Sequence, residues 1–423
     1  MPQDPVQTYA RRPVYEGPPL SLQAAVDEAL VRNPDLIALR AQFEAARHRP
    51  AQDRSLAPPT FEAQIWQWPL NTLNPANVNM YMFTAGQDIP GRGKRALRAS
   101  VAEKDVQLAE ADIAVQARDV IDRVKRAYAE LFLTRKAIEV NHDSLDLLRQ
   151  FADITSVKYT TGRSSQQETM KAIVEISTLH DHLVTLQQRA ALAEAQLNTL
   201  LDRRPEAPIG PLAEPRERVL LPATAALQQL ALEQQPELRV AQLGIERSAA
   251  ALAVATRDYK PDFFVGGGYM LMPRDTDAWT ATVGITWPSA PWSRGRLDAR
   301  KAEATADVEA ARARHRVVEN NIRFAVQDAY VRVKSAEQRA SLLRTTVVPQ
   351  SRQTLEVARV GYQADRVDFL ALLDDQRALL EAQLDYYRAL SDLEQALADL
   401  ERAIGADITP QMLGAVDVRE AGK

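Results

Sequence analysis

Four aspartates lie in one short stretch around the start of a predicted helix: Asp365, Asp368, Asp374 and Asp375. Carboxylates that line a narrow passage repel anions and attract cations, as in the acidic rings of cation channels. Acids are also expected at the N-terminal end of any solvated helix, because the helix dipole favours negative charge there. The sequence therefore leaves two interpretations open, a passage lined by acids and a solvated helix start.

A metal site or a catalytic site is not indicated by the remaining ionisable residues. His180 and His182 are close in sequence, but residues two apart on a helix point about 200° apart and cannot share one ion. The other histidines are scattered, and the chain has no cysteine to act as ligand, nucleophile or disulfide partner. No nucleophile–base pair or phosphate loop stands out. We expect no catalytic residue, no cofactor and no bound metal.

The composition is that of an ordered, helix-rich chain. Hydrophobic residues make up 46% and charged residues 26%, and a net charge of −4 over 423 residues gives no basis for nucleic-acid binding. No run of about 18 apolar residues occurs, so no transmembrane helix is predicted. The start, MPQDPVQTYARRP, does not contain the apolar core of a signal peptide. If the protein is exported, we expect its signal to be missing from this sequence.

One long helical segment is expected to position the other elements of the chain. Residues 94–161 contain neither Gly nor Pro and are rich in Ala, Leu, Arg, Glu, Gln and Lys, the strongest helix formers. A single helix of this length would extend for about 100 Å. The fold class is therefore predicted to be mainly α with a small β part, built from long helical hairpins.

The first half of the chain can be read in order. We predict an extended lead-in at 1–19 and then a first repeat at 20–204, which comprises helices at 21–32 and 34–56, strands at 61–68 and 78–88, the long helix, and a returning helix at 165–202. A proline-rich linker follows at 205–222.

The second half repeats this plan. Asn33-Pro34 returns as Gln235-Pro236 and Arg92-Gly93 as Arg294-Gly295, with offsets of 202 residues. The second repeat is expected at 223–405, with strands at 262–272 and 279–287, a long helix at 296–361 kinked by Pro349, and a returning helix at 367–404. Residues 406–423 are expected to form a C-terminal tail. The chain is interpreted as an internal duplication.

The last strand has two different faces. Trp279, Val283, Ile285 and Trp287 lie on one face with Ala281, while threonines and Gly284 lie on the other. An apolar face with aromatic ends is typical of a membrane β-barrel wall, although a half-buried soluble sheet has the same period. Four strands cannot close a barrel, and lipid does not tolerate open edges, so a membrane strand set requires several copies of the chain.

Two further groups of residues have two possible roles each. The turn formed by Thr160, Thr161, Gly162, Arg163 and Ser164 could dock a partner protein, or it could only reverse the chain. Basic residues at the starts of both long helices oppose the helix dipole, and they lie either near anionic headgroups or in solvent. They are Arg92, Lys94, Arg95, Arg98, Arg294, Arg296, Arg300 and Lys301.

Several motifs in this order resemble the TolC-type outer-membrane efflux channels. They are Pro-Gly-x-Gly-Lys-Arg at 90–95, Lys-Tyr-x-x-Gly-Arg-x-Ser-Gln-Gln at 158–167, Gly-Tyr through Phe-x-x-Leu-Leu-Asp at 361–374, and the exit into the linker at 200–205. The resemblance covers about 20–405, and the first two motifs are most similar to the heavy-metal efflux branch.

The resemblance implies a homotrimer with an α-helical barrel that continues into a 12-strand transmembrane β-barrel, to which each chain contributes four strands. It implies a location in the outer membrane of a Gram-negative bacterium, with the helices extending into the periplasm. It also implies a passive exit duct for substrates that a periplasmic adaptor protein and an inner-membrane pump of the RND type deliver, and the similarity to the heavy-metal efflux branch suggests metal cations as the substrates. The alternative is a soluble periplasmic scaffold of helical hairpins without a membrane barrel.

The resemblance also suggests where a gate would lie. The family's closed gate places acids one turn apart on the corresponding helix, and here only Asp374 matches, because the position one turn earlier is Ala371. The family's tip glycine corresponds to Asp365, and its gate arginine corresponds to Val367. The gate is therefore expected in a rearranged form, with candidates Asp374, Asp368, Asp365, Tyr362 and Arg366.

Overall fold

The computed structural model describes residues 12–70, 74–215 and 218–415. These residues fall into two compact units, which are described separately. The first unit takes the described residues of Met1–Ile37, Val115–Gln235 and Asn320–Lys423, and the second those of Ala38–Ala114 and Pro236–Glu319. Parts of the predicted lead-in, the first strand loop, the linker and the tail, at 1–11, 71–73, 216–217 and 416–423, lie outside the described residues.

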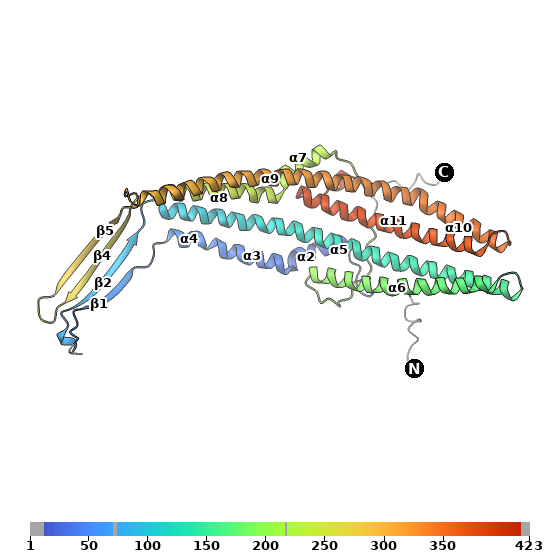
Figure 1. The fold of residues 1–423 in the computed structure, drawn as a ribbon, viewed down its shortest axis with the longest axis horizontal. Coiled ribbons are helices and arrows are strands. Elements are labelled where there is room, and N and C mark those ends of the chain that lie inside the picture. The colour runs from blue at the N-terminus through green and yellow to red at the C-terminus, as the bar shows by residue number, and fades with distance from the viewer. Residues whose placement is uncertain (1–11, 71–73, 216–217, 416–423) are drawn as a thin grey trace. The chain divides into compact units, whose positions relative to one another are not determined.

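The chain is mainly helical with a small antiparallel sheet, which confirms the predicted fold class at this level. The helices are α2 (Leu22–Arg32), α3 (Pro34–Arg47), α4 (Arg49–Arg54), α5 (Lys94–Thr160), α6 (Gln166–Leu200), α7 (Thr224–Gln234), α8 (Pro236–Arg257), α9 (Arg294–Leu342), α10 (Val348–Gln363) and α11 (Phe369–Ile404). Figure 1 shows them with these labels. No helix among the described residues is both long and apolar enough to cross a membrane.

Local chemistry explains where several helices begin and break. The Ser21 side chain accepts a hydrogen bond from the Ala24 amide, and Asp368 does the same for Ala371, so both act as N-caps. The predicted helix 34–56 is interrupted at His48, because Pro50 cannot donate a backbone hydrogen bond inside a helix. Before Pro349, the expected kink takes the form of a π-helical turn at Leu343–Val347.

The second unit contains one four-stranded sheet (Figure 1). Its strands are β1 (Thr60–Trp66), β2 (Met80–Ile89), β4 (Asp262–Leu271) and β5 (Ala278–Thr286), all antiparallel and in the order β1-β2-β4-β5. The four predicted strands are confirmed to within two residues at each end. Within the sheet, the contact between the two halves of the chain is made by β2 and β4. As a result, β1 and β5 are the two edges of the sheet.

Two large apolar clusters lie in the first unit, beside a smaller one at Ala340, Leu343 and Ala389. One joins α2 to the middle of α5 and the end of α6 through Val26, Val120, Leu131 and Leu197. The other packs the α5–α6 hairpin against the α10–α11 hairpin, with Phe151, Leu179, Leu355 and Phe369 at its centre. The two helical hairpins therefore share one core near their turns, where the candidate gate and docking residues lie.

Two short strands were not predicted from the sequence. β3 (Arg218–Leu220) in the expected linker pairs with β6 (Leu413–Ala415) in the expected tail. The prediction of a loose tail from residue 406 is therefore corrected for the part up to Ala415. Three-residue strands have no periodic pattern that a sequence reading could detect, and only the pairing partner makes them regular.

Candidate functional site

The register of the sheet sorts its side chains into two very different faces. Residues opposite each other in neighbouring antiparallel strands point to the same side. One face carries Phe61, Ala63, Ile65, Tyr81, Phe83, Ala85, Gln87, Ile89, Phe263, Val265, Gly267, Tyr269, Leu271, Trp279, Ala281, Val283 and Ile285. The other face carries mostly Thr, Gly, Met, Glu and Asp. Gln87 is the single strongly polar side chain on the apolar face.

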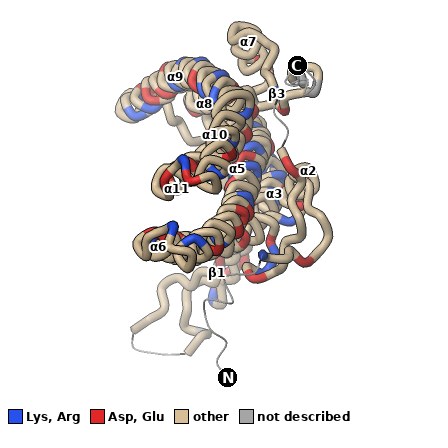
Figure 2. Tube along the Cα trace, turned by 90° about the vertical axis from the view of Figure 1, so that its right-hand side faces the viewer, with Lys and Arg blue, Asp and Glu red and all other residues tan. Residues whose placement is uncertain are grey.

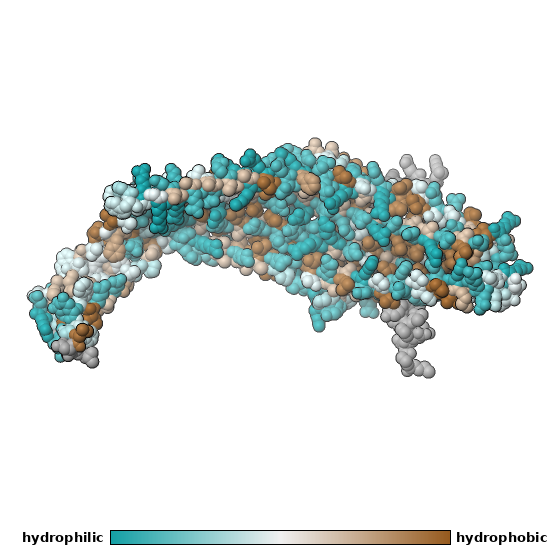
Figure 3. All heavy atoms as spheres, viewed as in Figure 1, coloured by the Kyte–Doolittle hydropathy of each residue, from teal (hydrophilic) through white to brown (hydrophobic). Residues whose placement is uncertain are grey.

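The apolar face is not covered by any described part of the chain. Trp279 and Val283 on β5 are 79% and 80% exposed, and Ile285 and Trp287 are also exposed. Figure 3 shows pale and brown residues along the visible side of the sheet, while teal dominates the helices. An apolar surface of this extent on a monomer indicates a binding partner or a lipid contact.

All five tryptophans of the chain belong to this sheet or its ends: Trp66, Trp68, Trp279, Trp287 and Trp292. Trp66 and Trp279 lie at the end with the strand loops, since they pair with Met80 and Tyr269. Trp287 and Trp292 lie at the opposite end, where the rings are 6.2 Å apart between centroids. The tryptophans thus form two groups at the ends of the strands.

An ion pair and a hydrogen bond fix the start of α5 beside the sheet. Asp262 at the start of β4 accepts a hydrogen bond of 2.7 Å from the Gly91 amide and binds Lys94 Nζ at 2.9 Å. The Lys94 side chain is only 3% exposed. A Cβ on Gly91 would lie 2.3 Å from the Pro261 carbonyl, so glycine is required for this close approach.

The turn between α5 and α6 presents polar groups to solvent. Thr160, Thr161, Gly162 and Arg163 are exposed, and Ser164 is half-buried. Gly162 has a φ of +73°, and the Gly162 and Arg163 amides donate to the carbonyls of Tyr159 and Lys158, which closes the helix end. The structure places the predicted docking residues together on one exposed turn.

The turn between α10 and α11 is held against the first turn by one lysine. Lys158 Nζ lies 2.6 Å from Asp365 Oδ1, also donates to the Tyr362 carbonyl, and sits 4.1 Å from the centre of the Tyr362 ring. The hydrogen bond and the charge of Lys158 lower the pKa of the Asp365 carboxyl. Asp365 itself has a φ of +55°, a conformation normally taken by glycine.

Tyr362 is enclosed between the two turns. It is 4% exposed, its hydroxyl donates to Glu168 at 3.0 Å, and its ring packs on Phe369 with centroids 5.6 Å apart. Burial raises the pKa of Tyr362. The residue is therefore positioned to hold the turns together within one chain, while Arg366 beside it is exposed.

The remaining gate candidates have different surroundings. Asp368 caps α11, and its Oδ1 accepts from the Ala371 amide at 2.7 Å. Asp374 is exposed and lies 3.6 Å from Arg377, whose guanidinium also binds the buried Glu175 of α6 in a two-point contact. The hydrogen bond to Glu175 raises the pKa of Arg377. The sequence reading missed Lys158, Glu175 and Arg377, because their partners are about two hundred residues away in the chain.

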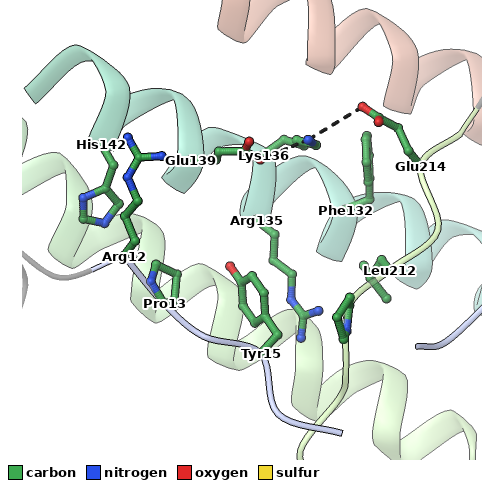
Figure 4. Close-up of a pocket in the computed structure, with 11 residues that line it drawn as sticks. Arg12, Pro13, Tyr15, Phe132, Arg135, Lys136, Glu139, His142, Leu212 and Glu214 are labelled. Atoms are coloured by element: carbon green, nitrogen blue, oxygen red, sulfur yellow. Dashed lines mark ion pairs between the residues drawn. The ribbon is translucent and has the colours of Figure 1, made fainter. Parts of the chain in front are cut away.

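A separate pocket of about 370 Å³ lies on α5 (Figure 4). The Tyr15 ring covers the Arg135 guanidinium at 3.8 Å, and Arg135 donates to the carbonyls of Ile209 and Gly210 and binds Glu194. Lys136 lies 3.0 Å from Glu139, so the cations in the middle of the pocket are already paired. We interpret it as the place where residues 12–15 and 209–214 fasten to α5.

A metal-binding constellation is missing from the described residues, where no three His, Cys, Asp or Glu side chains converge. His180 Nδ1 lies 2.9 Å from the Ile176 carbonyl, one turn back on its own helix. Charges of both signs alternate along the helices in Figure 2. The described residues therefore offer two candidate sites, both suited to binding and not to catalysis. One is the apolar face of the sheet in the second unit, and the other is the pair of joined helical turns in the first unit.

Comparison with known sequences gives one family. The profile of the family described as "Outer membrane efflux protein" matches residues 25–203 and 227–406. A curated relative is the "Cobalt-zinc-cadmium resistance protein CzcC" of Cupriavidus metallidurans, which is 25% identical over 366 residues, or 84% of this chain and 83% of that protein.

Solved structures share the fold. The outer membrane protein VceC of Vibrio cholerae superposes with a TM-score of 0.74 at 19% identity, covering 92% of this chain and 97% of VceC. The outer membrane channel MtrE of Neisseria gonorrhoeae, solved in an open state, gives a TM-score of 0.74 at 18% identity and covers 91% of this chain and 89% of MtrE. The arrangement of helices and strands is thus that of these channels.

Proposed function

This chain belongs to the outer membrane efflux protein family, and from that premise we propose that it is the outer-membrane duct of a tripartite efflux system. The family consists of channels and not of enzymes. In the proposed assembly an inner-membrane pump of the RND type delivers the substrate, a periplasmic adaptor protein connects the pump to this chain, and the chain supplies a passive exit.

The observation that carries the proposal is the two-faced sheet. Trp287 lies eight positions after Trp279, a span of about 19–26 Å depending on strand tilt, which approaches the ~25 Å apolar band of outer-membrane barrels. Tryptophans at both ends of the strands fit the two membrane interfaces, where amphipathic rings are enriched. Trp279, Val283, Ile285 and Trp287 are accordingly proposed to face lipid.

The open edges of the sheet support a trimer. β1 and β5 each leave one row of backbone hydrogen-bonding groups without a strand partner, a state that lipid does not tolerate. Three copies of the four-stranded sheet would give twelve strands with no free edge. The long helices of the same three copies would then form the helical part of the tunnel.

The joined turns support a gate and a docking tip. Asp365, Asp368 and Asp374 would each become three carboxylates in a trimer, and any set facing the lumen would favour cations. Tyr362 and Arg366 belong to the same turn, and Tyr362 together with Lys158 would hold the hairpins in one position. The exposed residues Thr160, Thr161, Gly162, Arg163 and Ser164 are proposed to contact the adaptor.

The proposed cargo is a divalent metal cation. The relative CzcC is named for cobalt, zinc and cadmium resistance, and acids rather than bases dominate the α10–α11 turn. Because a duct needs no resident ion, substrate choice is assigned to the pump rather than to this chain. The same family relationship supports a place in the outer membrane of a Gram-negative bacterium, with the helices in the periplasm.

We also propose that the two halves are duplicated repeats at about 20–204 and 223–405. The family profile matches twice, and the starts of the matches, 25 and 227, are 202 residues apart, as are Asn33 and Gln235. The side-chain amide of Asn33 donates a hydrogen bond to the Leu200 carbonyl at 3.1 Å, and the side-chain amide of Gln235 donates one to the Arg402 carbonyl at 2.9 Å. Corresponding side chains thus hold corresponding helix ends.

A neighbouring pair of substitutions tests the duct. Val283→Lys places a charge on the apolar face at mid-strand, where it would cost about 2–4 kcal/mol in a bilayer, while Thr282→Lys points to the other face. We expect Val283→Lys to reduce the number of channels formed in planar bilayers by at least about tenfold and Thr282→Lys to leave it nearly unchanged. Equal behaviour of the two variants, or a wild-type chain that never enters vesicles, would favour the soluble scaffold instead.

A further inference from the structure

A group of cations lies where the sheet passes into the helices of the second unit. Arg92 follows β2, Lys260 precedes β4, Arg98 lies in the first turns of α5, and Arg296 and Lys301 lie in those of α9. All five are exposed. None of them forms an ion pair with another residue in the part of the chain that the structure describes. We call these five residues the basic collar.

Three acids near the basic collar already have other partners. Asp262 binds Lys94 at 2.9 Å, Asp258 binds Arg300 at 2.9 Å, and Asp298 accepts from Tyr259 at 2.5 Å. The collar cations are therefore exposed and have no ion-pair partner among the described residues. Arg296 also lies in the first turn of α9, where the helix dipole already provides positive potential and a cation is unfavourable. An external anion would remove both costs.

The collar lies next to the aromatic end of the sheet. Arg92 is three residues beyond Ile89, and Arg296 is four residues beyond the exposed Trp292. Arg98 and Lys301 lie about 6 and 10 Å along their helices from the helix starts. The polar layer on each side of a bilayer is roughly 5–8 Å thick. If the tryptophans mark the interface, the collar residues other than Lys301 therefore lie at headgroup depth, and the long Lys301 side chain can reach back to it.

We propose that the basic collar binds the anionic headgroups of glycerophospholipids in the leaflet next to the helices. This inference rests on the proposed membrane insertion of the sheet. The flexible Arg and Lys side chains can each reach a different phosphate, so that lipids are held as a ring around the base of the barrel. Bound lipid would thereby fix the depth of the sheet in the membrane and seal its junction with the helices.

Native mass spectrometry of the full-length protein tests this inference. The protein is reconstituted in vesicles of equal parts phosphatidylglycerol and phosphatidylcholine, extracted in mild detergent, and the lipids that stay bound are counted. We expect an excess of about fivefold of phosphatidylglycerol on the wild-type protein. The variant R92Q/R98Q/R296Q/K301Q should retain both lipids nearly equally, and R92K/R98K/R296K should keep the excess because the charge is unchanged.

The matched control removes three exposed cations and the half-buried Lys171 from the first unit, K171Q/R189Q/R204Q/R352Q, and should keep the preference for phosphatidylglycerol. Equal retention on the wild-type protein, or an excess that survives in the collar variant, would overturn the lipid inference. In both cases channels would still form in vesicles of phosphatidylcholine alone, so the proposed duct would stand. A wild-type protein that inserts into neither kind of vesicle would overturn the duct itself and remove the premise of the collar.

Discussion

Lys158 is the residue on which the arrangement of the two helical turns depends most. It lies in the last turn of α5, and its ammonium group reaches Asp365 and the Tyr362 carbonyl at the end of α10. The Lys158 side chain is 13% exposed and that of Asp365 is 52% exposed, so solvent screens only one end of the pair. Such a contact is weak enough to open and specific enough to define a closed position.

We predict that Lys158→Gln increases the open fraction of the channel. The glutamine can still reach the carbonyl but loses the charge that holds Asp365, so the hairpins are released from each other. Single-channel recordings in planar bilayers should show an open fraction about two- to fivefold higher. Lys171→Gln on α6 is the control. An unchanged open fraction in Lys158→Gln would show that the pair does not restrain the turns.

The pH dependence of the same contact has a definite sign. Lys158 lowers the pKa of Asp365 below its usual 3.8, so the contact contributes in full above that value and is lost as the pH falls through the lowered pKa. The open fraction of the channel should therefore be the same at all pH values between about pH 5 and pH 8.

Single residues could be predicted where their function is local. A helix start at residue 21, a chain reversal at Gly162 and a helix start near Asp368 were expected, and the structure has a helix end at each of these residues. The partner of Lys158 could not be predicted, since 207 residues separate it from Asp365 and only the packing of two hairpins brings them together. The burial of Tyr362 was missed for the same reason.

At the scale of elements, the sequence predicted the strands and long helices well. Runs without Gly or Pro define α5 and α6, and alternation defines β4 and β5. The observed helices differ from the predicted ones where a proline changes the backbone of the residues before it. The π turn at Leu343–Val347 precedes Pro349, and α4 is separate from α3 because of Pro50. The pairing of β3 with β6 depends on tertiary contacts alone.

The duplication makes a prediction about helix ends. Asn33→Ala and Gln235→Ala each leave buried carbonyls at the end of α6 or α11 without a donor, which should cost about 1–2 kcal/mol locally. Hydrogen exchange should become roughly 5–30 times faster in the last turn of α6 for Asn33→Ala, and of α11 for Gln235→Ala. The exposed neighbour Gln234→Ala should have no effect. Faster hydrogen exchange in only one of the two variants would argue against equivalent roles of Asn33 and Gln235 in the two repeats.

Two features of the whole molecule support the proposed duct: the open edges of the sheet and the length of α5. In the proposed trimer, neighbouring copies close the two open edges of the apolar sheet, and helices as long as α5 bridge the distance to a partner. The family relationship makes an exit duct the simplest function that uses both. Composition and strand pattern alone could not decide between this duct and a soluble sheet, because both have the same period.

Cross-linking of the sheet edges tests the central claim most directly. The chain has no cysteine, so Ala63→Cys on β1 can be combined with one cysteine at each position from 279 to 285 on β5 without background. In membranes, the account predicts that one or two of these registers give a covalent trimer under oxidation, with no larger product. Cross-links only within a single chain, or an open series of larger polymers, would contradict the closed barrel of three copies.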